Sequence, residues 1–172
     1  MKNYIFLHPL SEKAEATAVQ RLARGPANVL QYSFTNDEIV DQLISHPLSM
    51  VITDAKCDPE GVQNPACFGN FPKFLQRARE QKTNSLEQIV YKMTGAPAER
   101  FGLENRGLVK NGYQADITVF DWENVRDNTT RENTTASPDG ILYVLINGEI
   151  AVDHGEYTNR LDIGQTIRSK NR

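Results

Sequence analysis

The chain has 172 residues, of which 39% are hydrophobic and 24% are charged, and a formal net charge of −3 at pH 7. This composition is ordinary for a globular protein, and the Lys and Arg residues form no cluster able to neutralise many phosphates, which argues against nucleic-acid binding. No apolar run reaches the ~20 residues of a membrane-spanning helix or follows the pattern of a signal peptide, so we expect no membrane segment and a cytoplasmic location.

The two cysteines, Cys57 and Cys67, are expected to be reduced. A chain of this size without a secretion signal gives no reason to predict a disulfide. Neither cysteine belongs to a CxxC pair, so the spacing disfavours a cysteine-based zinc site. A weaker alternative is that Asp54, Cys57 and Asp58 form a site for some other metal, although loop carboxylates are usually only solvated.

The first elements predicted are a helix at residues 11–24 and a strand at residues 28–34. Thr35 and Glu38 have the spacing of a capping box, which predicts a helix from there to about Ser45. The helix should end at His46-Pro47.

Residues 48–53 read LSMVIT and predict a buried strand with Asp54 at its C-terminal tip. Together with the strand at residues 28–34 and the helix between them, this strand would form a parallel crossover unit.

Residues 55–70 contain several helix breakers and predict a long loop. A helix is predicted at residues 71–81, with Phe71, Phe74, Leu75 and Ala78 facing inward. A capping box at Asn84 and Glu87 should open the next helix, which runs to Thr94. A short helix from Pro97 to Gly102 completes this part of the chain.

The last third predicts an antiparallel β module. Strands are expected at residues 117–120, 142–146 and 150–152, with a polar stretch at residues 126–138. The Asn147-Gly148 dipeptide is typical of a two-residue hairpin turn between the second and third strands.

Five segments resemble one enzyme family. Residues 107–121 read GLVKNGYQADITVFD and residues 144–148 read VLING, which is similar to the C-terminal segment of metal-dependent amidohydrolases. Three further segments resemble the D-aminoacylases, or N-acyl-D-amino-acid deacylases: HPLSMVITD at 46–54, FGNFPKFL at 68–75 and KMTGAPAERFGL at 92–103. The resemblance runs from about Val29 to Arg168.

This resemblance implies an α/β fold made of the last two βα units of an amidohydrolase-type TIM barrel and the C-terminal strands of its small β-sandwich domain. Residues 1–106 would form the partial barrel segment and residues 107–172 the C-terminal β module. The chain is thus expected to be a C-terminal fragment. Two strands cannot close a barrel, so a partner chain or self-association should cover the open sheet edges.

The activity that the resemblance implies is zinc-dependent hydrolysis of carbon–nitrogen bonds other than peptide bonds, with N-acyl-D-amino acids as substrates. Asp54 matches the family's catalytic aspartate, which passes a proton from the metal-bound water to the leaving nitrogen. The three histidines, His8, His46 and His154, include no His-x-His pair. Asp54 could therefore ligate zinc only if a partner supplies the other ligands, and this chain alone is expected to bind no zinc and to be inactive.

Two departures from the family pattern leave other readings open. Ala55 stands where the family commonly has Gly, and Ala66 stands where it commonly has an Arg suited to binding the substrate carboxylate. Asp54 could be only a loop cap, and Tyr32, Ser33 and Phe34 could line a pocket or simply pack. His46 is expected to cap a helix and His154 to lie in a solvated turn. The alternative function is a non-catalytic interaction or structural module.

Overall fold

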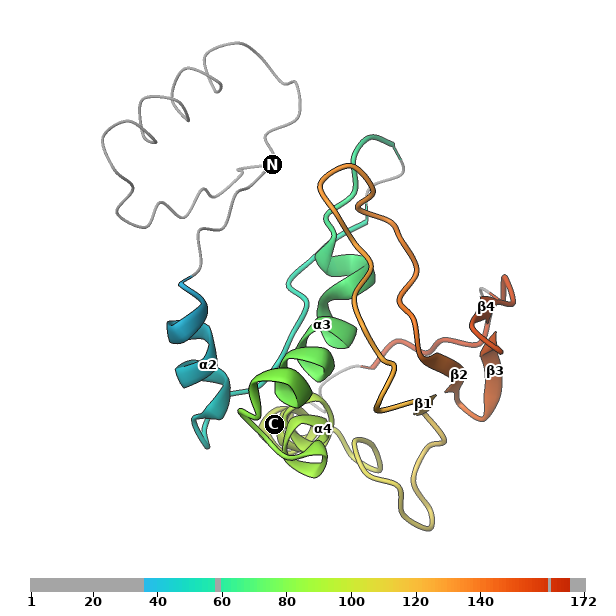
Figure 1. The fold of residues 1–172 in the computed structure, drawn as a ribbon. Coiled ribbons are helices and arrows are strands. Elements are labelled where there is room, and N and C mark those ends of the chain that lie inside the picture. Colours follow the sequence, from blue (N-terminus) through green and yellow to red (C-terminus); the bar gives the residue numbers. More distant parts are fainter. Residues whose placement is uncertain (1–35, 58–59, 161, 168–172) are drawn as a thin grey trace, which may run out of the picture. The chain divides into compact units, whose positions relative to one another are not determined.

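The computed structural model describes residues 36–57, 60–160 and 162–167. From Asp37 on, the chain forms one compact unit in which helices α2 to α5 precede an antiparallel sheet of strands β1 to β4 (Figure 1). The predicted helix at 11–24 and strand at 28–34 lie outside the described residues, and the predicted domain boundary at residue 106 stays a prediction. No helix in the described ranges is both long and apolar enough to cross a membrane.

Helix α2, Asp37–Ser45, has Asp37 and Glu38 in its first turn, where carboxylates suit the helix dipole. Only Ile44 of its apolar side chains is buried. The guanidinium of Arg77 holds α2 against α3, with its Nε 2.5 Å from Asp41 Oδ1 and one terminal nitrogen 3.1 Å from Asp37 Oδ1. Both carboxylates raise the pKa of Arg77, Asp41 by the stronger hydrogen bond.

Helix α3, Ala66–Gln81, begins five residues earlier than predicted. The prediction treated Gly69 as a helix breaker, but Gly69 is buried within the helix. A Cβ at this position would collide with the Asp127 carboxylate, so the glycine marks a close approach of the polar stretch that follows β1. Leu75 and Ala78 are buried as predicted, Phe74 is partly buried, and Phe71 is exposed.

Helices α4, Leu86–Met93, and α5, Gly95–Phe101, follow closely. The capping box of α4 is formed by Ser85 and Gln88, so the prediction of Asn84 and Glu87 was wrong by one residue. The Ser85 hydroxyl accepts the Gln88 amide at 3.3 Å, and the Gln88 side chain accepts the Ser85 amide at 2.9 Å. Gly95 opens α5 two residues before the predicted start, and Gly102 ends it.

The sheet has the order β1-β2-β3-β4, with every neighbouring pair antiparallel. Its strands are β1 Ile117–Phe120, β2 Ile141–Ile146, β3 Glu149–Asp153 and β4 Glu156–Tyr157. The first three confirm the predicted strands, whereas the two-residue β4 was not predicted.

Two tight turns join β2, β3 and β4. Asn147 and Gly148 have φ values of 53° and 85°, as the predicted hairpin requires. His154 and Gly155, with φ values of 48° and 85°, form a second turn of the same kind.

The helices and the first strand pack around one hydrophobic core. Ile89 of α4 and Val125, which follows β1, are fully buried, and Ile44, Val51, Leu75 and Ala78 complete the buried cluster. Phe120 and Ile141 of the sheet pack against it. Arg79 of α3 ties the turn after β1 to this core by donating to the carbonyl oxygens of Trp122 and, at 3.0 Å, Val125.

Candidate functional site

Asp54 lies in residues 49–57, a segment of irregular structure that follows α2. The predicted strand at 48–53 was wrong for the described structure, in which residues 49–53 have no regular structure. The strand predicted to pair with it, at residues 28–34, lies outside the described residues. Asp54 is exposed and has a φ of 42°, in the left-handed region that few residues other than glycine adopt. The chain therefore turns at Asp54, and the residue lies at the surface.

Lys92 of α4 holds the start of this segment. Its side chain is buried, with 6% exposed, and its Nζ donates to the His46 carbonyl oxygen at 2.5 Å, the Ser49 hydroxyl at 2.9 Å and the Ser49 carbonyl oxygen at 3.3 Å. Burial lowers the pKa of the Lys92 ammonium. No carboxylate among the described residues pairs with it, so neutral oxygens of the turn after α2 provide its hydrogen bonds.

Two further hydrogen bonds fix the segment closer to Asp54. The Val51 amide donates to the Lys92 carbonyl oxygen at 3.1 Å. The Asn70 side chain of α3 donates to the Ile52 carbonyl oxygen at 2.6 Å. The segment that carries Asp54 is thus attached to helices α3 and α4.

An open hollow of about 200 Å³ lies beside the same segment. Its lining is mainly apolar and comes from α2, α3 and residues 49–52, including Val40, Ile44, Met50, Val51 and Phe74. Nothing in this lining could act as an acid, a base or a metal ligand. The hollow could receive an apolar group, but by itself it is not a catalytic pocket.

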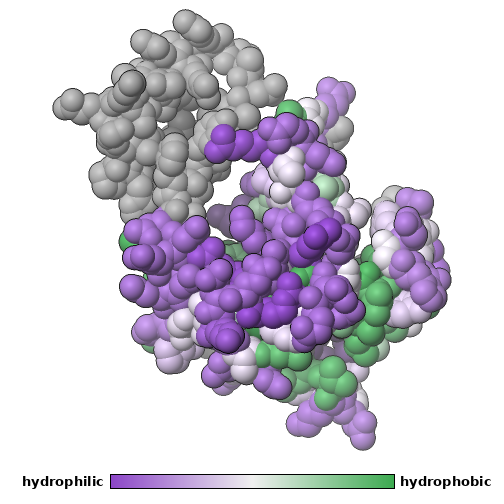
Figure 2. Space-filling model, in the orientation of Figure 1, coloured by the Kyte–Doolittle hydropathy of each residue, from purple (hydrophilic) through white to green (hydrophobic). Residues whose placement is uncertain are grey.

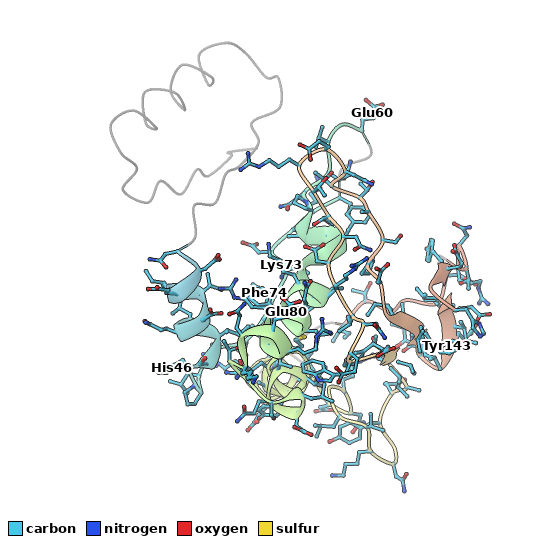
Figure 3. All side chains as sticks on the ribbon, viewed as in Figure 1. His46, Glu60, Lys73, Phe74, Glu80 and Tyr143 are labelled. Carbon is cyan, nitrogen blue, oxygen red and sulfur yellow. The ribbon has the colours of Figure 1, made fainter. Side chains whose placement is uncertain are left out.

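The other predicted site residues are not gathered around Asp54. His46 lies at the end of α2, where its Nδ1 accepts the Leu48 amide at 3.2 Å, so its ring binds the following turn rather than the end of the helix (Figure 3). Cys57 is exposed and Cys67 is half-buried in the first turn of α3, and no disulfide links the two. His8, Asp58 and residues 32–34 lie outside the described residues.

The described residues gather no set of side chains suited to zinc. Catalytic zinc usually has three protein ligands. Within the ranges that the structure describes, no group of three His, Cys, Asp or Glu side chains is placed to hold a metal ion. We therefore derive no chemical step through a metal from this chain alone.

His154 belongs to a hydrogen-bonded array that sequence reasoning missed. Its Nδ1 lies 2.6 Å from Asp153 Oδ1 and its Nε2 lies 2.6 Å from the Tyr143 hydroxyl. Tyr143 lies on the sheet, well away from His46 (Figure 3). The pairing of Tyr143 with Asp153 across β2 and β3 would have brought the three together, but this register was not predicted. The array is exposed and borders no described hollow.

Asp116, in the motif that precedes β1, has a structural position. Its carboxylate pairs with Arg106 and accepts the Asn147 backbone amide at 2.8 Å. The Asn147 side chain in turn donates to the Ile163 carbonyl oxygen at 2.6 Å. The two sequence motifs at 107–121 and 144–148 therefore meet at one corner of the sheet, where they fix the hairpin turn.

Comparison with known proteins identifies related hydrolases. The profile of the amidohydrolase family matches residues 17–152. The N-acyl-D-aspartate deacylase of Alcaligenes xylosoxydans xylosoxydans is 37% identical over 155 residues, which are 89% of this chain and 30% of that protein. The chain thus spans less than a third of the length of this curated relative.

Two solved structures are also similar. A crystal structure of D-aminoacylase matches 73% of this chain and 27% of its own, with a TM-score of 0.68 and 32% identity. N-acyl-D-glutamate deacylase from Bordetella bronchiseptica, complexed with zinc and a phosphonate that mimics the tetrahedral intermediate, matches 68% of this chain and 25% of its own. Its TM-score is 0.64 and its identity 35%. The described helices and antiparallel sheet therefore form part of an amidohydrolase-type fold.

Proposed function

Because this chain belongs to the amidohydrolase family, we propose that it forms part of a zinc-dependent hydrolase that removes the acyl group from N-acyl-D-amino acids. The observation that carries this proposal is its similarity, over 89% of its length, to an enzyme that deacylates a D-amino acid. A zinc complex of a second deacylase among the similar structures supports the choice of metal. The match covers 30% of the relative, so the activity belongs to a complete site of which this chain is one part.

Asp54 is the residue of this chain that we assign to the chemistry. It lies at a turn on the surface, eight residues after His46, in the segment that resembles the D-aminoacylases. In this role its carboxylate takes a proton from the attacking water and returns it to the nitrogen that leaves. The missing metal ligands would come from polypeptide beyond these residues.

The substrate carboxylate would need a binding group other than the residue at position 66. Ala66 lies at the start of α3, where its amide donates to the Asn64 side chain at 3.0 Å. Alanine offers no charge for a carboxylate. We expect this binding group to lie outside the described residues, and the amino acid preferred need not be that of the relatives.

Apolar side chains beside the Asp54 segment support a covering partner. Leu48 is 84% exposed, Ile52 60% and Leu43 62%, all near the hollow lined by residues 49–52. A second group lies before and on the sheet, where Figure 2 also shows hydrophobic surface; it includes Phe101, Leu108, Val109, Val119 and Leu142. Exposed apolar side chains that gather in patches often mark the surface where another protein binds. The proposed occupant is the polypeptide that carries the missing ligands.

The alternative is a non-catalytic structural module. Ala66 and Ala55 favour it, since both positions depart from the family pattern in the region where the substrate would bind. Such a module would keep the apolar contacts but have no need for a carboxylate at position 54.

Zinc content and deacylation, measured together, test the proposal. The chain would be purified without chelators, alone and in whatever assembly it forms, and assayed with N-acetyl derivatives of D-Asp, D-Glu and D-Met and their L-enantiomers. We expect about one zinc per active site, hydrolysis of D-substrates only in the assembled form, and its loss in Asp54→Asn. Asp153→Asn is the matched exposed carboxylate and should keep full activity. Zinc-loaded assembly without hydrolysis, or hydrolysis that survives Asp54→Asn, would count against the assignment.

A further inference from the structure

The backbone around Asp54 is attached to helices by side chains. Ser49 accepts from Lys92 of α4, and Ile52 accepts from Asn70 of α3. These contacts lie five and two residues before Asp54.

Holding a turn with a buried lysine is unfavourable in free energy. Burying an ammonium group is unfavourable unless hydrogen bonds replace its water. Lys92 has the three hydrogen bonds that its Nζ can donate, and all of them go to His46 or Ser49. A Lys on the buried side of α4, three residues after Ile89, would not be needed for packing alone.

Asn70 makes the second attachment from a different helix. Its amide hydrogen bond to Ile52 is short, 2.6 Å, and it acts on the residue two positions before the turn at Asp54. Lys92 and Asn70 therefore constrain the segment at two points and from two helices, which limits the directions available to the residue that follows.

We propose that Lys92 and Asn70 are positioning residues that fix the direction of the Asp54 side chain. This inference rests on the proposed function, in which Asp54 carries the proton. Neither residue touches substrate: Lys92 acts through the turn at 46–49 and Asn70 through Ile52. We call these two attachments, of Lys92 to the turn at 46–49 and of Asn70 to Ile52, the clamp. Both residues belong to segments that resemble the D-aminoacylases, and the clamp is a physical reason for this resemblance.

Amide hydrogen exchange in the full chain tests the clamp. In Lys92→Met, which keeps the length and removes the charge, we expect the Val51 amide, which donates to the Lys92 carbonyl oxygen, to exchange about tenfold faster, the effect of losing hydrogen bonds from a charged group. Amides of β2 and β3 should keep their rates. Lys92→Arg, which retains charge and donors, should restore most of the protection.

Asn70→Asp gives an independent version of the test if Lys92→Met fails to fold. It keeps the shape of the side chain but removes the donor to Ile52, and it should also speed exchange of the neighbouring Val51 amide. Lys73→Met, an exposed change on α3 (Figure 3), should have no effect. Ile89→Val serves as a core change that lowers stability without touching the clamp, and it should not single out the Val51 amide.

The clamp is refuted if the Val51 amide keeps its rate in both Lys92→Met and Asn70→Asp, or if all protected amides, including those of β2, accelerate equally. Exchange needs neither zinc nor substrate. An intact clamp with hydrolysis that ignores Asp54→Asn would refute the proposed function alone, whereas unchanged exchange with Asp54-dependent hydrolysis would refute only the clamp.

Discussion

The sheet and the Asp54 segment show two ways of holding backbone in place. Strand β2 pairs with β1 on one side and β3 on the other, and a two-residue turn links β2 to β3. Residues 49–53 are held instead by α3 and α4, through Asn70 and Lys92. The sheet is therefore held largely by contacts between strands that follow one another in the sequence. The proposed catalytic segment is held by side chains from helices that come later in the chain.

This difference has a consequence for function. A paired strand can lose one side chain and keep its hydrogen-bonded ladder. The Asp54 segment has no such ladder in the described structure, so the loss of either attaching side chain should reach it first. Substitutions on each side test this comparison, beginning with the largest expected effect.

Ile89→Ala should weaken the helical region most. Ile89 is fully buried on α4, and its truncation should lower the free energy of unfolding by about 2–5 kcal/mol through lost burial and the cavity left behind. Urea denaturation measures this loss. Ile150→Ala on β3, where the side chain is 44% exposed, is the matched change in the sheet and should cost much less. Equal losses would show that the two regions do not differ in this way.

Asp116→Ala should have the largest polar effect in the sheet region. It removes the acceptor for the Asn147 amide and leaves Arg106 without its carboxylate, so we expect a loss of about 1–3 kcal/mol. Chemical denaturation would measure it, and hydrogen exchange should show loosening at the β2–β3 turn. Asp153→Ala, at the other turn and exposed, is the control and should change stability little. No change in Asp116→Ala would refute the structural position given to this motif.

Ser85→Ala should cost about 1 kcal/mol by removing the cap of α4. Asn84→Ala is the sharp control because Asn84 was predicted to be the cap. In the described structure its side-chain oxygen is buried without a hydrogen-bond partner, so removing it should cost little or even stabilise the protein. Thermal unfolding of both variants decides which residue opens the helix.

The smallest expected effect is on acid stability at the connection from β1 to β2. Hydrogen bonds from Asn124 and backbone amides lower the pKa of Asp121, and those from Asn128 and Arg126 lower the pKa of Asp139. In the folded protein both pKa values lie below the ordinary pKa of aspartate. The two carboxylates therefore stabilise the fold at any pH above that ordinary pKa, and this stabilisation is lost as the pH falls through their lowered pKa values. Asn128→Ala should therefore narrow the difference between melting temperatures at pH 7 and in acid. An unchanged difference would contradict it.

Local signals in the sequence predicted most of the regular structure. The Asn147-Gly148 turn and the β2 and β3 strands beside it are confirmed because turn chemistry and alternation act over a few residues. The start of α3 was missed because the reason for Gly69 is its contact with Asp127, 58 residues away. The segment at 48–53 has the composition of a strand, but a strand also needs a paired neighbour, which composition alone does not specify.

The site was less predictable than the fold. The sequence motif predicted Asp54 as a functional position, and its catalytic role remains a prediction. Lys92 and Asn70 could not be connected to it from sequence, because their contacts join residues 46 and 18 positions apart. A charged residue on the buried side of α4 was the one available signal, and Lys92 was read only as part of a motif.

The hydrogen bonds around Asn147 also affect the rate of deamidation at the Asn147-Gly148 sequence. Asn-Gly sequences deamidate when the glycine nitrogen attacks the asparagine side chain to form a succinimide. Here the Gly148 amide donates to the Ala115 carbonyl oxygen at 2.9 Å, and the Asn147 side chain donates to Ile163 at 2.6 Å. Both reacting groups are thus held by other partners in the folded state. The rate of deamidation at Asn147 should therefore depend on the fraction of time for which these two hydrogen bonds are broken.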